Sequence, residues 1–177
     1  MTNELIKYAE LIREWSTERG LHDKDPRKQI LKLGEEAGEL FAGIAKKKID
    51  LVKDAVGDVF VVIIIYCQQK GIKIDEVLEA FNVTQRSYEE NDNDSTLYSI
   101  KLMQKIGMLA ADTIYSDNNN NIRLQVTWVL EDLLTVCQVK NLDFIECIEI
   151  AYNEIKDRKG EMKDGTFVKA SDLENHH

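Results

Sequence analysis

Residues 53–67 read KDAVGDVFVVIIIYC, and as a helix this stretch would be apolar on every side except at its few charged positions. A helix that is apolar all round is typical of the centre of a protein. The run from Ala55 to Cys67 is too short to span the ~30 Å of membrane hydrocarbon, and it contains Asp58. A lone buried carboxylate is costly unless it is paired or neutralised. The stretch therefore predicts a central buried helix that carries an acidic site.

Helical periodicity continues on both sides of this stretch. Apolar residues from Leu5 to Trp15 and from Ile30 to Ile44 recur at helical spacing, and Asp25-Pro26 is typical of a helix start. Further helices are expected near 50–70, 74–89, 95–115, 121–140 and 143–158. After Gly160, the pair Asp164-Gly165 favours a turn. We expect an all-α fold of the four-helix-bundle type, a single domain over 1–177, with a short C-terminal hairpin or extended tail.

Composition limits the possible partners. The chain has 177 residues and a net charge of −9, so its overall field repels nucleic-acid backbones and acidic membrane surfaces. Its three cysteines are an odd number without C-x-x-C spacing, which argues against a disulfide framework or a zinc site. We interpret them as small core residues. These features predict a cytoplasmic protein that binds neither nucleic acid nor membrane.

The chain also resembles itself, with degenerate repeats at about 26–90 and 95–160. Placing Gly38 on Gly107 aligns several neighbouring residues. One inserted residue later, Cys67-Gln68-x-Lys70 falls on Cys137-Gln138-x-Lys140. We interpret this as an internal tandem duplication. The alternative is that two amphipathic helical hairpins align this well by chance.

Acidic residues gather on two of the expected helices. The segment LGEEAGEL at 33–40 holds Glu35, Glu36 and Glu39, and the next helix places Asp54 and Asp58 one turn apart. Carboxylates this close repel one another unless a cation lies between them. Two facing acidic helices offer the oxygen ligands that Mg²⁺ prefers. The alternative for Glu35 is a solvated acid that pairs with a nearby lysine.

Glycines and basic residues accompany the acids. Gly34, Gly38 and Gly57 each cost a helix roughly 1 kcal/mol relative to alanine, so we interpret them as points of close helix approach. A basic cluster follows at the end of the last helix, where lysine and arginine side chains could hold phosphate. The candidate phosphate-binding residues are Asn153, Lys156, Arg158, Lys159 and Lys32. Alternatively, the cluster is an ordinary set of cations at a helix C-terminus, and Lys32 pairs with a neighbouring glutamate.

The acidic pattern resembles a known family. Glu-Glu-x-x-Glu at 35–39, followed by acidic-x-x-x-Asp at 54–58 and an apolar run, resembles the MazG-type all-α nucleotide pyrophosphohydrolases, relatives of the dimeric dUTPases and phosphoribosyl-ATP pyrophosphatases. The segment NEIKDRKGEMKDGTFVKASDL at 153–173 is similar to the ending of short MazG-like proteins of phages and Gram-positive bacteria. The family's second motif is usually Glu-x-x-Asp, and this chain has Ala55 where that glutamate would stand.

The resemblance implies a function. It implies hydrolysis of nucleoside triphosphates (NTP or dNTP) between the α and β phosphates, in a role of nucleotide-pool housecleaning and in a homo-oligomer or pseudo-dimer assembly. Mg²⁺, with Mn²⁺ as a substitute, would be held mainly by Glu36, Glu39 and Asp58. Glu35 and Asp54 would be supporting ligands or the base that orients water.

The predicted repeat adds the expectation that the two halves of the chain share one site. In the second copy, Gln104, Lys105, Met108 and Trp128 stand where the first copy has its acids. We therefore expect one site per chain, with acids from the first half and cations from the second. The alternative is a catalytically degenerate nucleotide-binding or regulatory helical module, or a helical adaptor whose acidic faces bind a partner.

Overall fold

The computed structural model describes residues 2–84, 94–116, 118–163 and 166–169. Within these residues the chain forms seven helices and one two-stranded sheet. The helices are α1 (Thr2–Glu18), α2 (Pro26–Ala45), α3 (Ile49–Gln69), α4 (Ile74–Thr84), α5 (Ser95–Tyr115), α6 (Asn119–Val139) and α7 (Phe144–Ile155), and the strands are β1 (Gly160–Lys163) and β2 (Thr166–Lys169). The expected all-α fold with a C-terminal hairpin is confirmed.

Local sequence explains where the helices begin. Asp25 accepts a hydrogen bond from the backbone N–H of Arg27 at 2.9 Å, and Pro26 occupies the first turn of α2. Asp94, Asn118 and Asp143 cap α5, α6 and α7 in the same way. The last helix ends at Ile155 rather than near residue 158, because the chain turns there to enter β1. Part of the helix expected over 74–89 and the hairpin turn at 164–165 lie outside the described residues.

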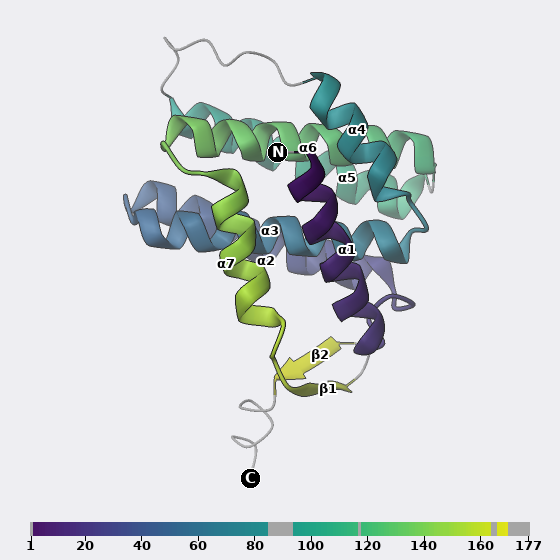
Figure 1. Ribbon diagram of the computed structural model, residues 1–177. Coiled ribbons are helices and arrows are strands. Elements are labelled where there is room, and N and C mark those ends of the chain that lie inside the picture. The colour runs from purple at the N-terminus through teal and green to yellow at the C-terminus, as the bar shows by residue number, and fades with distance from the viewer. Residues whose placement is uncertain (1, 85–93, 117, 164–165, 170–177) are drawn as a thin grey trace.

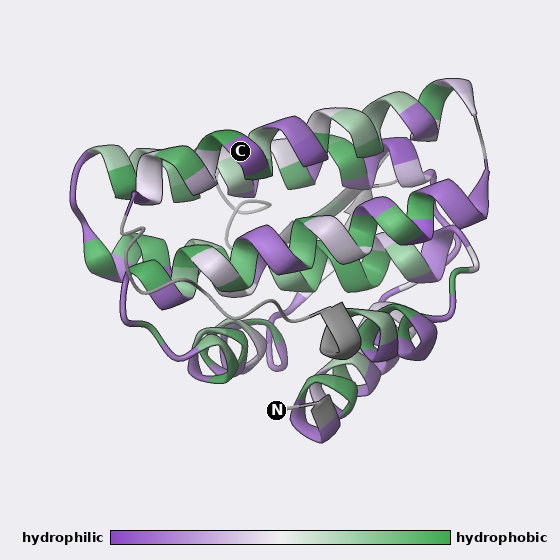
Figure 2. Cartoon of the chain, turned by 90° about the horizontal axis from the view of Figure 1, so that it is seen from above, coloured by the Kyte–Doolittle hydropathy of each residue, from purple (hydrophilic) through white to green (hydrophobic). Residues whose placement is uncertain are grey.

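The four long helices form two antiparallel hairpins, α2–α3 and α5–α6, that pack against each other. In Figure 1 these helices run horizontally, while α1 and α7 cross in front of them. Figure 2 shows the same body from above, with the crossing helices along one of its sides. Helix α7 packs on α3, and α4 packs on α6, so each half of the chain covers the other. The hairpin β1–β2 lies below the ends of α1 and α7.

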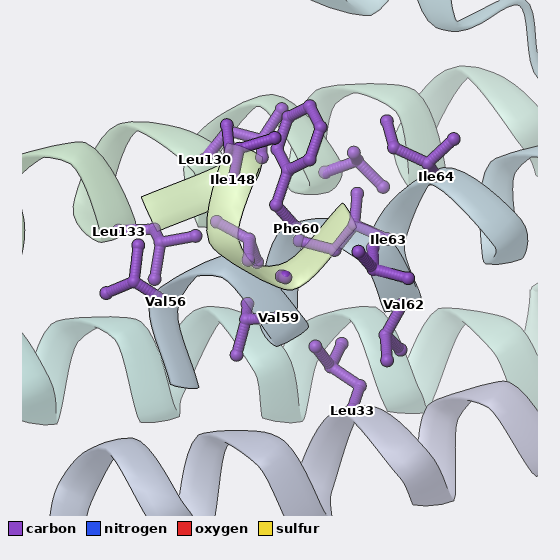
Figure 3. Close-up of a cluster of buried hydrophobic side chains, with 14 of the residues drawn as sticks. Leu33, Val56, Val59, Phe60, Val62, Ile63, Ile64, Leu130, Leu133 and Ile148 are labelled. Carbon is purple, nitrogen blue, oxygen red and sulfur yellow. The ribbon is translucent and has the colours of Figure 1, made fainter. Parts of the chain in front are cut away.

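Helix α3 is the centre of the core, as its sequence predicts. Every residue from Ala55 to Cys67 except Asp58 is buried. Figure 3 shows Phe60 beside Leu130 and Ile148, with Leu33 reaching the opposite side of α3. All three cysteines are buried and unpaired in disulfides, in agreement with their interpretation as core residues.

Of the three glycines expected at close helix contacts, only Gly57 lies at one. A Cβ on Gly57 would come within 2.2 Å of the Cys147 carbonyl oxygen, so α7 can cross α3 here only over a glycine. A Cβ on Gly34 or Gly38 would meet nothing within 4 Å. The expectation for these two was wrong, because both lie on the exposed face of α2.

The two halves of the chain share the geometry of one turn as well as the order of their helices. Gly71 and Asn141, each one residue beyond the lysine that caps its helix, have φ of 67° and 54°. The backbone N–H groups of the residues that follow, Ile72 and Leu142, donate to the carbonyl oxygens of Cys67 and Cys137 at 2.8 and 2.9 Å. Such matching turns, together with the reciprocal packing of the halves, are what a duplication would produce. The repeat itself stays a prediction.

Candidate functional site

A pocket of about 530 Å³ runs along the groove between α2 and α3. Its lining on α2 follows one helical stripe from Gln29 through Lys32 and Glu36 to Glu39. Its lining on α3 runs the opposite way, from Asp54 through Asp58 to Ile65. Because the two helices are antiparallel, the acids of both share one end of the groove, and the amide and apolar residues share the other.

All five acids singled out from the sequence line this pocket. Glu36 is the most enclosed of the α2 acids, at 7% exposed, whereas Glu35 and Glu39 are exposed. The Lys32 ammonium lies 2.7 Å from Glu36 and 3.0 Å from Glu35. The alternative interpretation of Lys32, that it pairs with neighbouring glutamates, is therefore realised in this structure. Its ammonium supplies the positive charge that makes a buried Glu36 tolerable.

Asp58 has no comparable partner. It makes no hydrogen bond or ion pair with any described residue, although Arg158 lies near enough to favour its charged form. Burial, and after it the negative charges of Glu36, Asp54 and Glu154, together raise the pKa of Asp58 to about 7. Part of the pocket's acidic end is thus an uncompensated carboxylate, the kind of group that a bound cation would stabilise.

The departure at position 55 has a structural counterpart. Ala55 is fully buried in the core, while Asp54 lines the pocket. One residue of helix rotates a side chain by about 100°, so only one of these two positions can face the acids of α2. In this chain the carboxylate is at position 54, which lines the pocket with those acids.

The predicted basic cluster divides between two surfaces. Arg158 lines the pocket, whereas Asn153, Lys156 and Lys159 do not and are exposed. Lys156 instead donates to the Asn153 side chain at 2.8 Å. The separation arises because α7 ends at Ile155, and the turn that follows brings Arg158 alone back toward the acids. Phosphate binding by these residues stays a prediction.

Sequence reasoning missed several lining residues. Glu154 contributes a further carboxylate, and its spacing of four residues from Arg158 could have indicated a shared face. Lys24 and Asp25 line the pocket from the loop before α2. Apart from these two charged residues, Lys28 and the amides, the other end is apolar and aromatic, built from Trp15, Leu21, Val61, Val62, Ile65, Ile155 and Phe167. Three of these come from α1, the following loop and β2, and no local pattern links them to the acids.

Trp15 anchors this apolar end. Its indole N–H donates to the Ile155 carbonyl at 2.7 Å, and its ring meets Phe167 edge-on at 5.9 Å between centroids. The Arg19 guanidinium lies over the same indole, 4.7 Å from the ring centroid, and donates to the Arg158 carbonyl at 3.0 Å. These contacts hold together α1, the end of α7 and β2, and so position Arg158 at the pocket.

The carboxylates of the pocket suit a hard cation, but they do not enclose one. Carboxylate oxygens are the ligands that Mg²⁺ and Mn²⁺ accept, and seven carboxylates line the pocket. Within the described ranges, no three His, Cys, Asp or Glu side chains are arranged closely enough to hold a metal by themselves. Magnesium commonly takes only one or two protein carboxylates and completes its shell with water and phosphate oxygens. The orphaned Asp58 carboxylate is consistent with such an open site.

The second half has different chemistry at the aligned positions. The Lys105 ammonium lies over the Trp128 ring, 4.6 Å from its centroid, on α5 and α6. By the predicted repeat these residues correspond to Glu36 and Asp58, which influence each other across α2 and α3. A cation–π pair thus stands where the first half has two acids.

Comparison with known proteins assigns part of the chain. Residues 24–84 match the family model of the MazG nucleotide pyrophosphohydrolase domain, which confirms the resemblance deduced from the acids. A 77-residue stretch is 46% identical to an uncharacterized 18.2 kDa protein from the rep–hol intergenic region of Haemophilus phage HP1. That match covers 43% of this chain and 46% of the phage protein, so it spans about half of that relative's length. No solved structure matches the chain significantly. Across the described residues, no helix is both long and apolar enough to cross a bilayer.

Proposed function

Because residues 24–84 match the MazG nucleotide pyrophosphohydrolase domain, we propose that this chain hydrolyses nucleoside triphosphates, NTP or dNTP, between the α and β phosphates. The observation that carries the proposal is the shared pocket of the acids and Arg158. Carboxylates that can bind a divalent cation and a guanidinium that can bind phosphate there come from opposite halves of the chain. A polyphosphate would satisfy both.

Glu36, Glu39 and Asp58 would be the principal ligands of Mg²⁺ or Mn²⁺, with Glu35 and Asp54 as supporting ligands. When bound there, the cation would neutralise phosphate oxygens and offset the charge that develops during hydrolysis. The uncompensated charge of Asp58 supports this assignment, since a cation would lower the cost of holding it ionised. Lys32 would then be released from part of its pairing with Glu35 and Glu36, and could turn toward phosphate.

The chemistry needs a water molecule and a base. A carboxylate at the acidic end, with exposed Glu35 as the candidate, would orient the water and accept its proton. The water oxygen would form a bond to the α phosphorus, and the bond from that phosphorus to the bridging oxygen would break. The products would be the nucleoside monophosphate and pyrophosphate. Arg158 would hold the phosphates bidentately, and the nearby Asn153, Lys156 and Lys159 are further candidates for this role.

The direct test is pyrophosphate release from a panel of canonical and modified NTPs and dNTPs with Mg²⁺. Glu39→Gln and Asp58→Asn should each lower kcat/KM by on the order of 10²-fold. Glu79→Gln, an exposed carboxylate on α4 outside the pocket, should leave it unchanged. Turnover indifferent to both pocket changes would overturn the site. Nucleotide binding without turnover would instead favour a degenerate binding module.

The predicted homo-oligomer has one physical support. Large hydrophobic side chains remain exposed on the outer faces of α2 and α5, among them Leu31 at 76%, Ile114 at 63% and Ile100 at 59%. A second copy would cover such a surface. Light scattering on the eluting protein should report a mass above that of one chain, and Ile100→Lys should reduce it. A role in removing surplus or modified nucleotides would follow from the substrate preference that the panel reveals.

A further inference from the structure

The apolar end of the pocket contains an amide with no partner. Gln29 is only 9% exposed and lines the pocket, yet its carboxamide makes no hydrogen bond to any described residue. The amide atoms themselves are not sealed from solvent, so they remain open to the volume of the pocket. The Gln29 carboxamide is therefore available to whatever occupies the pocket, and it offers one donor group and one acceptor.

A second carboxamide is partly unsatisfied at the same end. Gln69 donates from Nε2 to the Leu21 carbonyl at 2.9 Å, which orients its amide because a carbonyl can only accept. Its Oε1 is shielded from solvent and has no hydrogen-bond partner among the described residues. Because this oxygen is sealed from solvent, a ligand could reach it only after the Gln69 side chain moves, so Gln29 is the amide that meets an occupant directly. Gln29 lies in the first turn of α2 and Gln69 is the last residue of α3, so the antiparallel helices bring both to the same end of the pocket.

The surroundings of these amides combine flat apolar side chains with charged ones. Trp15, Leu21, Ile65 and Phe167 line this end of the pocket together with Lys24, Asp25 and Lys28. The spacing of seven residues from Gln29 to Glu36 places the amide about 10 Å along the helix axis from the acids. A ligand that fits both ends must have a polyanionic part and, some 10 Å away, a flat apolar part with hydrogen-bonding edges. A nucleotide has this layout.

We propose that the substrate's nucleobase occupies the apolar end of the pocket and that the Gln29 carboxamide hydrogen-bonds to its Watson–Crick edge, as the specificity-determining residue of this chain. This inference rests on the proposed function, because it uses the acids as the phosphate end. The carboxamide can accept from the ring N–H of uracil, thymine or guanine, or donate to the ring nitrogen of cytosine or adenine, which carries no hydrogen. Methylation of that ring nitrogen blocks the hydrogen bond in both cases, whichever base is preferred.

The test compares Gln29→Met with the wild type on the full chain. Methionine keeps the length of the side chain and removes both hydrogen-bonding groups. We expect kcat/KM for the preferred nucleotide to fall at least about tenfold and the differences among bases to shrink. Gln138→Met, the same substitution at an exposed site on α6, should change neither. Inorganic tripolyphosphate, which has no base, should inhibit the wild type and Gln29→Met equally.

A second measurement uses the wild type alone and so does not depend on how the variant folds. The preferred nucleotide should be hydrolysed at least about tenfold more efficiently than its analogue methylated at N3 of a pyrimidine or N1 of a purine. If the wild type hydrolyses nucleotides but Gln29→Met keeps the same base ranking, or the methylated analogue is an equal substrate, this inference is overturned while the proposed function stands. If the wild type hydrolyses no nucleotide, the proposed function fails first.

Discussion

Replacing Asp58 by asparagine should stabilise the metal-free protein, although the same change should strongly lower its activity. The Asp58 carboxylate is mostly buried, faces the charges of Glu36, Asp54 and Glu154, and has its pKa raised from 3.8 to about 7. The folded state therefore holds the Asp58 proton more tightly than the unfolded chain does. Stability from this group is fully present below pH 4 and is lost as the pH rises through about 7.

The magnitude follows from the difference between the two pKa values. A difference of about three corresponds to about 4 kcal/mol if it is fully expressed. Because part of the carboxylate faces the pocket and its water, we expect about 1–3 kcal/mol at pH 8. Asparagine avoids this loss, so Asp58→Asn should melt several degrees higher than the wild type, at about 2–4 °C per kcal/mol.

The assay is urea or thermal unfolding in EDTA at pH 4.5 and pH 8. The advantage of Asp58→Asn should be small at pH 4.5 and large at pH 8. Glu79→Gln on α4 serves as the matched control for removing a carboxylate and should show no such increase. An Asp58→Asn variant that is no more stable than the wild type at pH 8, or whose advantage is the same at both values, would refute the reasoning. Added Mg²⁺ should stabilise the wild type and narrow the gap.

Four further substitutions follow from the packing and the charges. Gly57→Ala should destabilise the protein by more than about 2 kcal/mol, since its Cβ would meet the α7 backbone at 2.2 Å. Gly34→Ala should instead stabilise the protein by up to about 1 kcal/mol, because alanine favours the helix and its Cβ would meet nothing within 4 Å. Urea titration compares the free energies of unfolding of the two variants. Lys32→Met should lower the melting temperature in EDTA because buried Glu36 loses its ammonium partner, and added Mg²⁺ should restore it; unchanged melting would argue against the pairing. Asp143→Ala should cost about 1 kcal/mol by removing the cap of α7, and a normal melting temperature would contradict that role.

Much of the fold could be predicted from the sequence because helix formation here is governed by local and periodic signals. The capping residues Asp25 and Asp143 and the apolar stripes place the helices to within a few residues. The misjudged glycines show where this reasoning stops. Helix propensity assigns the same cost to Gly34 and Gly57. Only the path of α7 distinguishes an exposed glycine from one at a helix crossing.

The candidate site divides in the same way. The acids on α2 and α3 share a face because of their spacing, so the sequence alone predicts that Glu36, Glu39 and Asp58 converge. The spacing of the basic cluster does not indicate which of its members reaches them. Arg158 lines the pocket because the chain turns after Ile155, and that turn depends on how α7 packs against α1 and α3.

The sequence by itself therefore determined the helices, the burial of α3 and the acidic face, because each depends on residues within one or two turns of one another. Only the tertiary structure decided that Trp15, Gln29 and Phe167 form the opposite end of the same pocket. These residues lie on α1, α2 and β2, and their meeting depends on long-range packing of the crossing helices and the hairpin on the α2–α3 pair. Local periodicity records which face of a helix is buried, but it does not record which distant segment covers that face.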